Sequence, residues 1–163
     1  FYGDNFHLGY FTKDSESFEE ALGNHTDAVA KMARLADNKN VLDVGCGIGA
    51  PAIRLAKQFN CKIVGVNISA EQVQQGTTLV NESGLSEKIR LRKGNALDLD
   101  FDDSSFDAIL CLEVAGDICV QPSQKKQLIK EMNRVLKPGG HVGFSDLIFT
   151  ASPTRESASH LKK

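Results

Sequence analysis

The 163-residue sequence contains no long apolar run, no excess of either charge and no paired cysteine motif. No stretch approaches the roughly 20 apolar residues that a membrane-spanning helix needs, and no signal peptide is visible. The net charge of −2 and the pI near 6.1 give no electrostatic reason to expect a polyanionic partner. We therefore expect a globular protein with no membrane span and no nucleic-acid partner.

The cysteines also lack a pattern. Cys46, Cys61, Cys111 and Cys119 show neither a C-x-x-C pair nor the spacing of a metal site. Each lies in or beside an apolar segment, which predicts buried, reduced thiols. The sequence thus predicts no metal site and a cytoplasmic or similarly reducing compartment.

The length and an ordinary composition, 41% hydrophobic and 25% charged, fit a single domain. We expect residues 1–14 to form a separate N-terminal segment and residues 15–149 an α/β core. Residues 150–163 are polar and rich in serine, and the pattern of the core stops before them. They are interpreted as a tail that begins a missing C-terminal part.

Strands and helices alternate along the core. Strands are predicted at residues 41–44, 62–69, 89–93, 106–112 and 141–149. Helices are predicted at residues 15–37, at 50–59, from a Ser69–Gln72 capping box to Gly84, and at 125–137, where "KPGG" stops the last one. Such alternation predicts a parallel sheet with right-handed crossovers.

The stretch "VLDVGCGIGA", residues 41–50, joins a strand to a helix through a glycine loop. On its own this loop fits a dinucleotide, a phosphate, S-adenosylmethionine (SAM), or only a tight turn. Asp43 lies two residues before the first glycine. Its carboxylate would repel a pyrophosphate, whereas it can face the ammonium group of SAM. Asp43 therefore favours SAM.

Three further motifs follow in order: "IVGVNIS", "GNALDLDF" and "RVLKPGGHVGFSD". With the glycine loop they make residues 40–146 resemble the class I SAM-dependent methyltransferases. The N-terminal "DNFHLGYF" resembles the small-molecule branch, with its sterol, tocopherol, cyclopropane-fatty-acid and sarcosine-type enzymes.

This resemblance implies a Rossmann-like, doubly wound, mostly parallel sheet with helices on both faces, here without the last strands of the seven-stranded family fold. It also implies methyl transfer to a C, N or O atom of a small metabolite. We expect a missing C-terminal segment or a second copy to cover the exposed sheet edge.

The resemblance also assigns residues to the cofactor. They are Phe6, His7, Asp43, Gly45, Cys46, Gly47, Asn67, Ile68, Gln72, Asn95 and Ala96. Asp43 would orient the amino group of methionine, and Asn67 and Asn95 would reach the ribose and the adenine. The family usually carries acids at these two positions. Because amides form weaker hydrogen bonds than carboxylates, we expect weaker binding of SAM.

Two residues are candidates for catalysis. Glu113, after the fourth strand, is predicted to act as a base or as a counter-charge; the alternative is a carboxylate that only orients the cofactor or a loop N–H. His7 is a second candidate base, although packing on the cofactor as part of a lid is the simpler role. "CLEVAG" lacks the Asn/Asp-Pro-Pro-aromatic motif of enzymes that methylate base amino groups. A SAM-binding module without catalysis and an NAD(P)-dependent oxidoreductase remain as alternatives.

Overall fold

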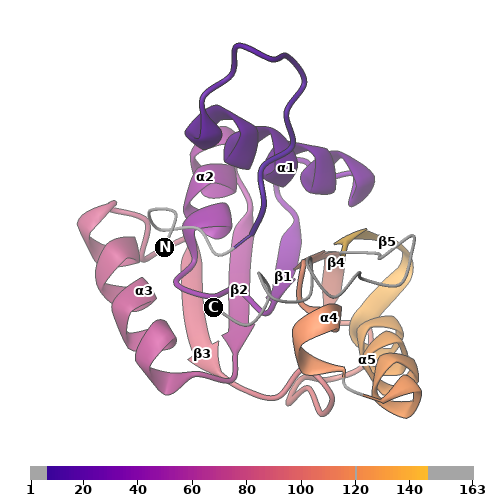
Figure 1. Cartoon of the computed structure of the whole chain (residues 1–163). Coiled ribbons are helices and arrows are strands. Elements are labelled where there is room, and N and C mark those ends of the chain that lie inside the picture. Colours follow the sequence, from indigo (N-terminus) through magenta and orange to yellow (C-terminus); the bar gives the residue numbers. More distant parts are fainter. Residues whose placement is uncertain (1–6, 120, 147–163) are drawn as a thin grey trace, which may run out of the picture.

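The computed structural model describes residues 7–119 and 121–146 (Figure 1). The helices are α1 (Phe18–Met32), α2 (Ala50–Gln58), α3 (Ala70–Glu82), α4 (Ala115–Ile118) and α5 (Pro122–Val135). The strands are β1 (Asn40–Val44), β2 (Lys62–Asn67), β3 (Ile89–Lys93), β4 (Phe106–Leu112) and β5 (Leu136–Ser145). The predicted cofactor residue Phe6 and the predicted tail at 150–163 lie outside the described residues.

The strands form one parallel sheet in the order β3-β2-β1-β4-β5. The chain therefore builds outward from β1 to β3 on one side and then continues with β4 and β5 on the other. Ligands of such sheets bind at the carboxyl ends of the strands where this order reverses, here between β1 and β4. The prediction of a doubly wound parallel sheet is confirmed.

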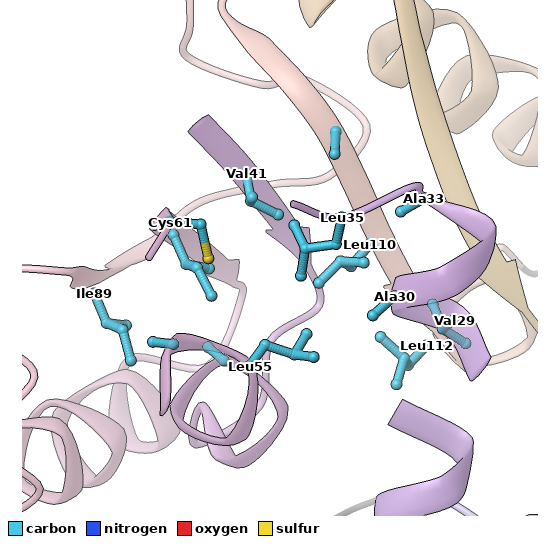
Figure 2. Close-up of a cluster of buried hydrophobic side chains, with 14 of the residues drawn as sticks. Val29, Ala30, Ala33, Leu35, Val41, Leu55, Cys61, Ile89, Leu110 and Leu112 are labelled. Carbon is cyan, nitrogen blue, oxygen red and sulfur yellow. The ribbon is translucent and has the colours of Figure 1, made fainter. Parts of the chain in front are cut away.

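Helices cover both faces of the sheet, and each face has its own core. Val29 of α1, Leu55 of α2 and Val80 of α3 pack together on one face, as the close-up of Figure 2 shows in part. Leu128 of α5 packs on the other face. From Ala108 to Leu112, successive residues of β4 alternate between the two cores, so this central strand is buried on both sides and is mostly apolar.

The ends of several elements differ from the sequence predictions. Helix α1 begins after Ser17, whose side chain forms a capping box with Glu20, and it ends by Ala33, because Arg34 takes a left-handed φ of +47°. Strand β2 ends at Asn67, since Ser69 serves as the N-cap of α3.

The last helix and strand are also shifted. Helix α5 begins at Pro122, three residues before its predicted start, because proline suits the first turn. The helix ends before "KPGG", as predicted, but two residues earlier than the predicted end, and the strand begins at Leu136 rather than at residue 141. The helix ends at Val135, and "KPGG" lies inside β5, where the pairing with β4 shifts register after Phe106.

No helix among the described residues is long and apolar enough to cross a membrane.

Candidate functional site

The loop between β1 and α2 depends on its glycines. Gly45, Gly47 and Gly49 have φ angles of +74°, +54° and +81°, in the left-handed region that glycine adopts without strain. The backbone N–H of Gly45 donates to the carbonyl of Val66 at 2.8 Å. A Cβ on Gly45 would lie 2.3 Å from Cγ2 of Val114. The loop is thus folded tightly against β2 and the residues after β4.

A cavity of about 280 Å³ opens beside this loop. This volume lies just below the range of about 300–1,000 Å³ that is typical of small-molecule sites. Its lining comprises Gly45, Val66, Asn67, Ile68, Gly94, Asn95, Ala96, Leu97, Val114 and Gln124. Several of the residues assigned from the sequence to the cofactor therefore share one cavity. Among them Ile68 is 64% exposed, and it presents an apolar surface at the cavity.

Asp43, the residue before the last in β1, is in an unusual state for an acid. Its side chain is 2% exposed, and Oδ2 has no hydrogen-bond partner among the residues that the structure describes. Burial raises its pKa to about 7. The Cys111 thiol, whose pKa burial raises to about 12, is one of the groups near it. A buried carboxyl with an unused oxygen fits a ligand that brings a cation and N–H donors, such as an amino acid ammonium group.

Asn67 and Gln72 form one unit at the end of β2. The Asn67 amide donates from Nδ2 to Oε1 of Gln72 at 2.5 Å, and the backbone N–H of Gln72 donates to Ser69 Oγ at 3.3 Å. The predicted Ser69–Gln72 capping box is therefore only half formed, because the Gln72 side chain turns to Asn67 instead. With its nitrogen bound to Gln72, Asn67 offers a ligand its Oδ1 oxygen.

Asn95 shapes the loop after β3. Its Oδ1 accepts the backbone N–H of Leu97 at 2.9 Å, which closes an Asx turn. The N–H of the preceding Gly94 donates to the carbonyl of Asn67 at 3.0 Å, so the ends of β2 and β3 are joined. Because the Asn95 oxygen holds the turn, its exposed amide nitrogen is the group that can donate to a ligand.

The remaining loop residues contribute through their backbone. The Cys46 side chain is buried, and its thiol contacts the carbonyl of Gly47 at 3.7 Å. Burial raises the Cys46 pKa far above its usual value, so the thiol is neutral and unreactive. The lining of the cavity does not include Cys46, Gly47, Gln72 or Asp43.

Glu113 and His7 lie in a second group of residues. Glu113 follows β4, and its Oε2 accepts the backbone N–H of Leu8 at 2.9 Å. His7 is 6% exposed, its Nδ1 lies 3.0 Å from the Leu8 carbonyl oxygen, and burial lowers its pKa. Its ring meets that of His25 edge-on at 5.0 Å between centroids. The Glu113 carboxylate thus accepts a hydrogen bond from a loop N–H, and its role as a base or as a counter-charge stays a prediction.

His25 belongs to this second group although sequence reasoning gave it no site role. Its Nδ1 donates to the Leu8 carbonyl at 2.7 Å, and its Nε2 lies 2.9 Å from Ser145 Oγ. These partners are 17 and 120 residues away, so no local pattern could reveal them. The described residues contain no cluster of three or more side chains that could hold a metal ion.

A parallel sheet with this strand order, a glycine loop after its first strand and a cavity at its carboxyl edge define a Rossmann-like, cofactor-binding domain. Within that class, residues 41–140 match the methyltransferase domain family. The chain belongs to this family, as the sequence motifs predict.

Similar proteins support this assignment. The chain is 32% identical to a 27-O-demethylrifamycin SV methyltransferase of Amycolatopsis mediterranei, over 93% of this chain and 54% of the relative. It is also 32% identical to a sterol 24-C-methyltransferase of Aspergillus fumigatus, over 98% of this chain and 41% of the relative. The chain therefore spans about half the length of these relatives.

Solved structures share the fold. One is described as the 4+2 cyclase SpnF, with a TM-score of 0.77 and 34% identity over 83% of this chain and 49% of that one. Another is a sarcosine dimethylglycine methyltransferase from Galdieria sulphuraria, described as putative, with a TM-score of 0.74 and 27% identity over 83% of this chain and 52% of that one. The fold class predicted from the sequence is confirmed by these neighbours.

Proposed function

We propose that this chain binds SAM and takes part in the transfer of its methyl group to a C, N or O atom of a small metabolite. The observation that carries the proposal is the buried carboxyl of Asp43, with its unused oxygen, beside the glycine loop of a methyltransferase domain. The ammonium group of methionine would supply the cation and the N–H donors that this carboxyl lacks.

The other residues of the site fit the rest of SAM. The backbone of Gly45, Cys46 and Gly47 would pass along the methionine, and Oδ1 of Asn67 would accept from a ribose hydroxyl. Ile68 would cover one face of the adenine, while Asn95 and the backbone N–H of Ala96 would donate to its edge. Phe6, His7 and Gln72 complete the proposed set. When bound, SAM supplies a methyl group on a positively charged sulfur, and transfer is an in-line displacement.

The protein must mainly place the acceptor atom about 3–3.5 Å from the methyl carbon and exclude water. A base is needed only where the acceptor arrives protonated. The two curated relatives are named for a rifamycin and for sterols. We therefore propose a small organic acceptor of similar kind, and no nucleic acid.

Calorimetry and a transfer assay test this proposal. We expect SAM and S-adenosylhomocysteine to bind, and NADH not to bind. We also expect label from methyl-labelled SAM to appear in at least one compound of a panel of sterols, polyketides, amines and phenols. A folded chain that binds NADH and not SAM would instead support the oxidoreductase alternative.

A second candidate is a SAM-binding protein that does not transfer methyl groups. It is favoured by the similarity to SpnF, a protein described as a cyclase. In that case SAM binds, label stays in SAM, and a substrate is rearranged without a gain in mass. Mass spectrometry of the products separates the two candidates.

We also propose a reducing compartment such as the cytoplasm, because all four cysteines are buried free thiols. Strand β5 is the last strand of the described sheet, and its Phe144 is 39% exposed. A further segment of a longer chain, or a second copy of this one, is proposed to cover this edge.

A further inference from the structure

We propose that Glu113 and His25 are positioning residues, which hold the described part of the N-terminal segment, residues 7–14, at the carboxyl ends of β4 and β5, and that Glu113 is not a base. They do so by binding both polar groups of Leu8. We call Glu113, His25 and Ser145, together with the Leu8 backbone, the Leu8 clasp. Its role in turnover rests on the proposed function, whereas its role in holding the segment does not.

The Leu8 clasp binds both the N–H and the carbonyl of Leu8. Oε2 of Glu113 accepts the Leu8 N–H at 2.9 Å, and Nδ1 of His25 donates to the Leu8 carbonyl at 2.7 Å. The Leu8 side chain is 46% exposed, so packing does little to fix this residue. The position of Leu8 therefore depends on hydrogen bonds from distant parts of the chain, while the Tyr10 N–H, which donates to the Ala21 carbonyl at 2.8 Å, holds the segment two residues further on.

His25 and Glu113, the two residues that bind Leu8, both contact Ser145. Ser145, the last residue of β5, contacts Nε2 of His25 through its hydroxyl at 2.9 Å. Its carbonyl accepts the backbone N–H of Glu113 at 2.8 Å. The side chains of His25 and Glu113 are only 12% and 13% exposed, and Nδ1 and Oε1 lie 3.6 Å apart. The two side chains are thus largely buried, lie close to each other, and are both held by the last residue of β5.

The backbone of Glu113 indicates that its side chain has a specific task. Its φ of +52° lies in the left-handed region, which disfavours residues other than glycine. Such a strained position at a strand end points to a function of the side chain that requires this direction. The next residue, Val114, contacts Gly45 and lines the cavity. A change in the clasp therefore acts one residue from the cavity wall.

A base must bring an oxygen lone pair within hydrogen-bond reach of the proton that it removes. In Glu113, Oε2 is bound to the backbone of Leu8 and Oε1 faces His25. What this arrangement requires of residue 113 is a hydrogen-bond acceptor, not a negative charge that takes up a proton. Glutamine keeps such an acceptor and cannot act as a base, which makes the two roles separable.

The test compares Glu113→Ala with Glu113→Gln by two measurements: amide exchange at Leu8, followed by NMR, and turnover with SAM. For Glu113→Ala we expect exchange at Leu8 to rise and turnover to fall, each by about tenfold or more, the loss typical of a hydrogen bond to a charged group. Glu113→Gln is expected to bring both values back to within about threefold of the original protein.

A second pair of variants tests the role of His25. His25→Asn keeps a donor near the position of Nδ1 and loses the contact with Ser145, whereas His25→Ala loses both. We expect Leu8 exchange to increase more in His25→Ala than in His25→Asn. Glu82→Ala removes an exposed carboxylate at the end of α3 and serves as the matched control, with no change in Leu8 exchange.

Two results would overturn the proposal. In one, Glu113→Gln is as inactive as Glu113→Ala while the Leu8 amide stays protected, which makes Glu113 a base. In the other, Leu8 exchanges equally fast in Glu113→Ala and in the original protein. If no form of the protein transfers a methyl group, the proposed function fails, and the exchange measurements alone still decide whether the clasp exists.

Discussion

The carboxyl edge of the sheet has two halves that are built in different ways. In the half formed by β1, β2 and β3, side chains bind close neighbours: Asn67 binds Gln72, five residues on, and Asn95 binds the N–H two residues on. In the half formed by β4 and β5, Glu113 binds Leu8 across 105 residues. The side-chain hydrogen bonds of the first half are therefore local, whereas those of the second half form only once the whole domain has folded.

A substitution of Asp43 should affect the first half of the edge and leave the second half unchanged, and it has the largest expected effect. Asp43→Asn keeps the shape of the side chain but cannot carry the charge that an ammonium group needs. We expect the affinity for SAM to fall at least about 100-fold, as when one partner of a buried charge pair is removed. The Leu8 clasp is expected to stay intact. Calorimetry and Leu8 amide exchange measure both effects.

The stability of the same variant provides the control. Ionised Asp43 is buried without a cation among the described residues to pair with it, so the charge costs free energy in the unliganded fold. Asp43→Asn should therefore unfold at an equal or higher temperature at pH 8. A lower unfolding temperature together with weak binding would mean that the variant has lost its fold rather than a specific contact.

A pair of glycine substitutions tests how tightly the first half is packed. Gly45→Ala places a Cβ against Val114 at a φ of +74°, whereas Gly84→Ala has a φ of +67° with nothing within 4 Å. We expect the free energy of unfolding to fall by about 2–5 kcal/mol for Gly45→Ala, of which backbone strain accounts for about 1–2 kcal/mol and overpacking for the rest. Gly84→Ala should cost only the strain, about 1–2 kcal/mol.

Urea unfolding of both variants gives the comparison. Equal losses would show that the space beside Gly45 adapts and that the loop is not locked against Val114.

The contrast between the halves also explains what the sequence could predict. The predicted bounds of residues 89–93 and 106–112 match β3 and β4, because β3 alternates apolar with charged residues before Gly94 and β4 is a short run that is apolar apart from Asp107. The glycine loop and the cavity residues were found because their motifs are local.

The clasp could not be found in this way. His25 reads as one more polar residue on an amphipathic helix, and its partner Ser145 is 120 residues away. Helix α5 and strand β5 meet without a loop between Val135 and Leu136, so "KPGG", which has the composition of a turn, lies inside a strand. Leu136 pairs with Phe106 and His141 with Ala108, so residues 137–140 form an irregularity between two paired parts of the strand, and the left-handed φ of +77° at Gly139 fits their turn-like composition.

The pH dependence gives a smaller effect confined to the first half. Because the pKa of Asp43 is raised from 3.8 to about 7 in the fold, the neutral carboxyl stabilises the unliganded protein fully below pH 3.8. This contribution is lost as the pH rises through about 7, by up to about 1.4 kcal/mol per pH unit. Ammonium binding needs the ionised form, so the affinity for SAM should change in the opposite direction.

We expect the affinity for SAM to fall about fivefold from pH 7 to pH 6 and about fiftyfold from pH 7 to pH 5, with the uptake of one proton by free Asp43. Calorimetry in buffers of different ionisation enthalpy counts the protons released on binding. Asp43→Asn should remove this dependence, while Leu8 exchange, corrected for its intrinsic pH dependence, should stay the same. A pH dependence that persists in Asp43→Asn would assign it to another group.

The smallest expected effect concerns Asn67, where the family usually carries an acid. Asn67→Asp replaces an amide that already donates to Gln72 with a carboxylate that can accept from both ribose hydroxyls. The Gln72 amide can turn to donate its nitrogen to the new oxygen, so the unit at the end of β2 is preserved. Since hydrogen bonds to charged groups are stronger, the affinity for SAM should rise by up to about tenfold.

Titration with SAM measures this gain, and S-adenosylhomocysteine, which has the same ribose, should gain equally. A gain for SAM alone would mean that the new charge acts on the sulfonium rather than through the ribose. A weaker affinity for both would mean that the Asn67–Gln72 pair is the better ribose site in this chain, so that the amide is an adaptation of the first half and not a defect in it.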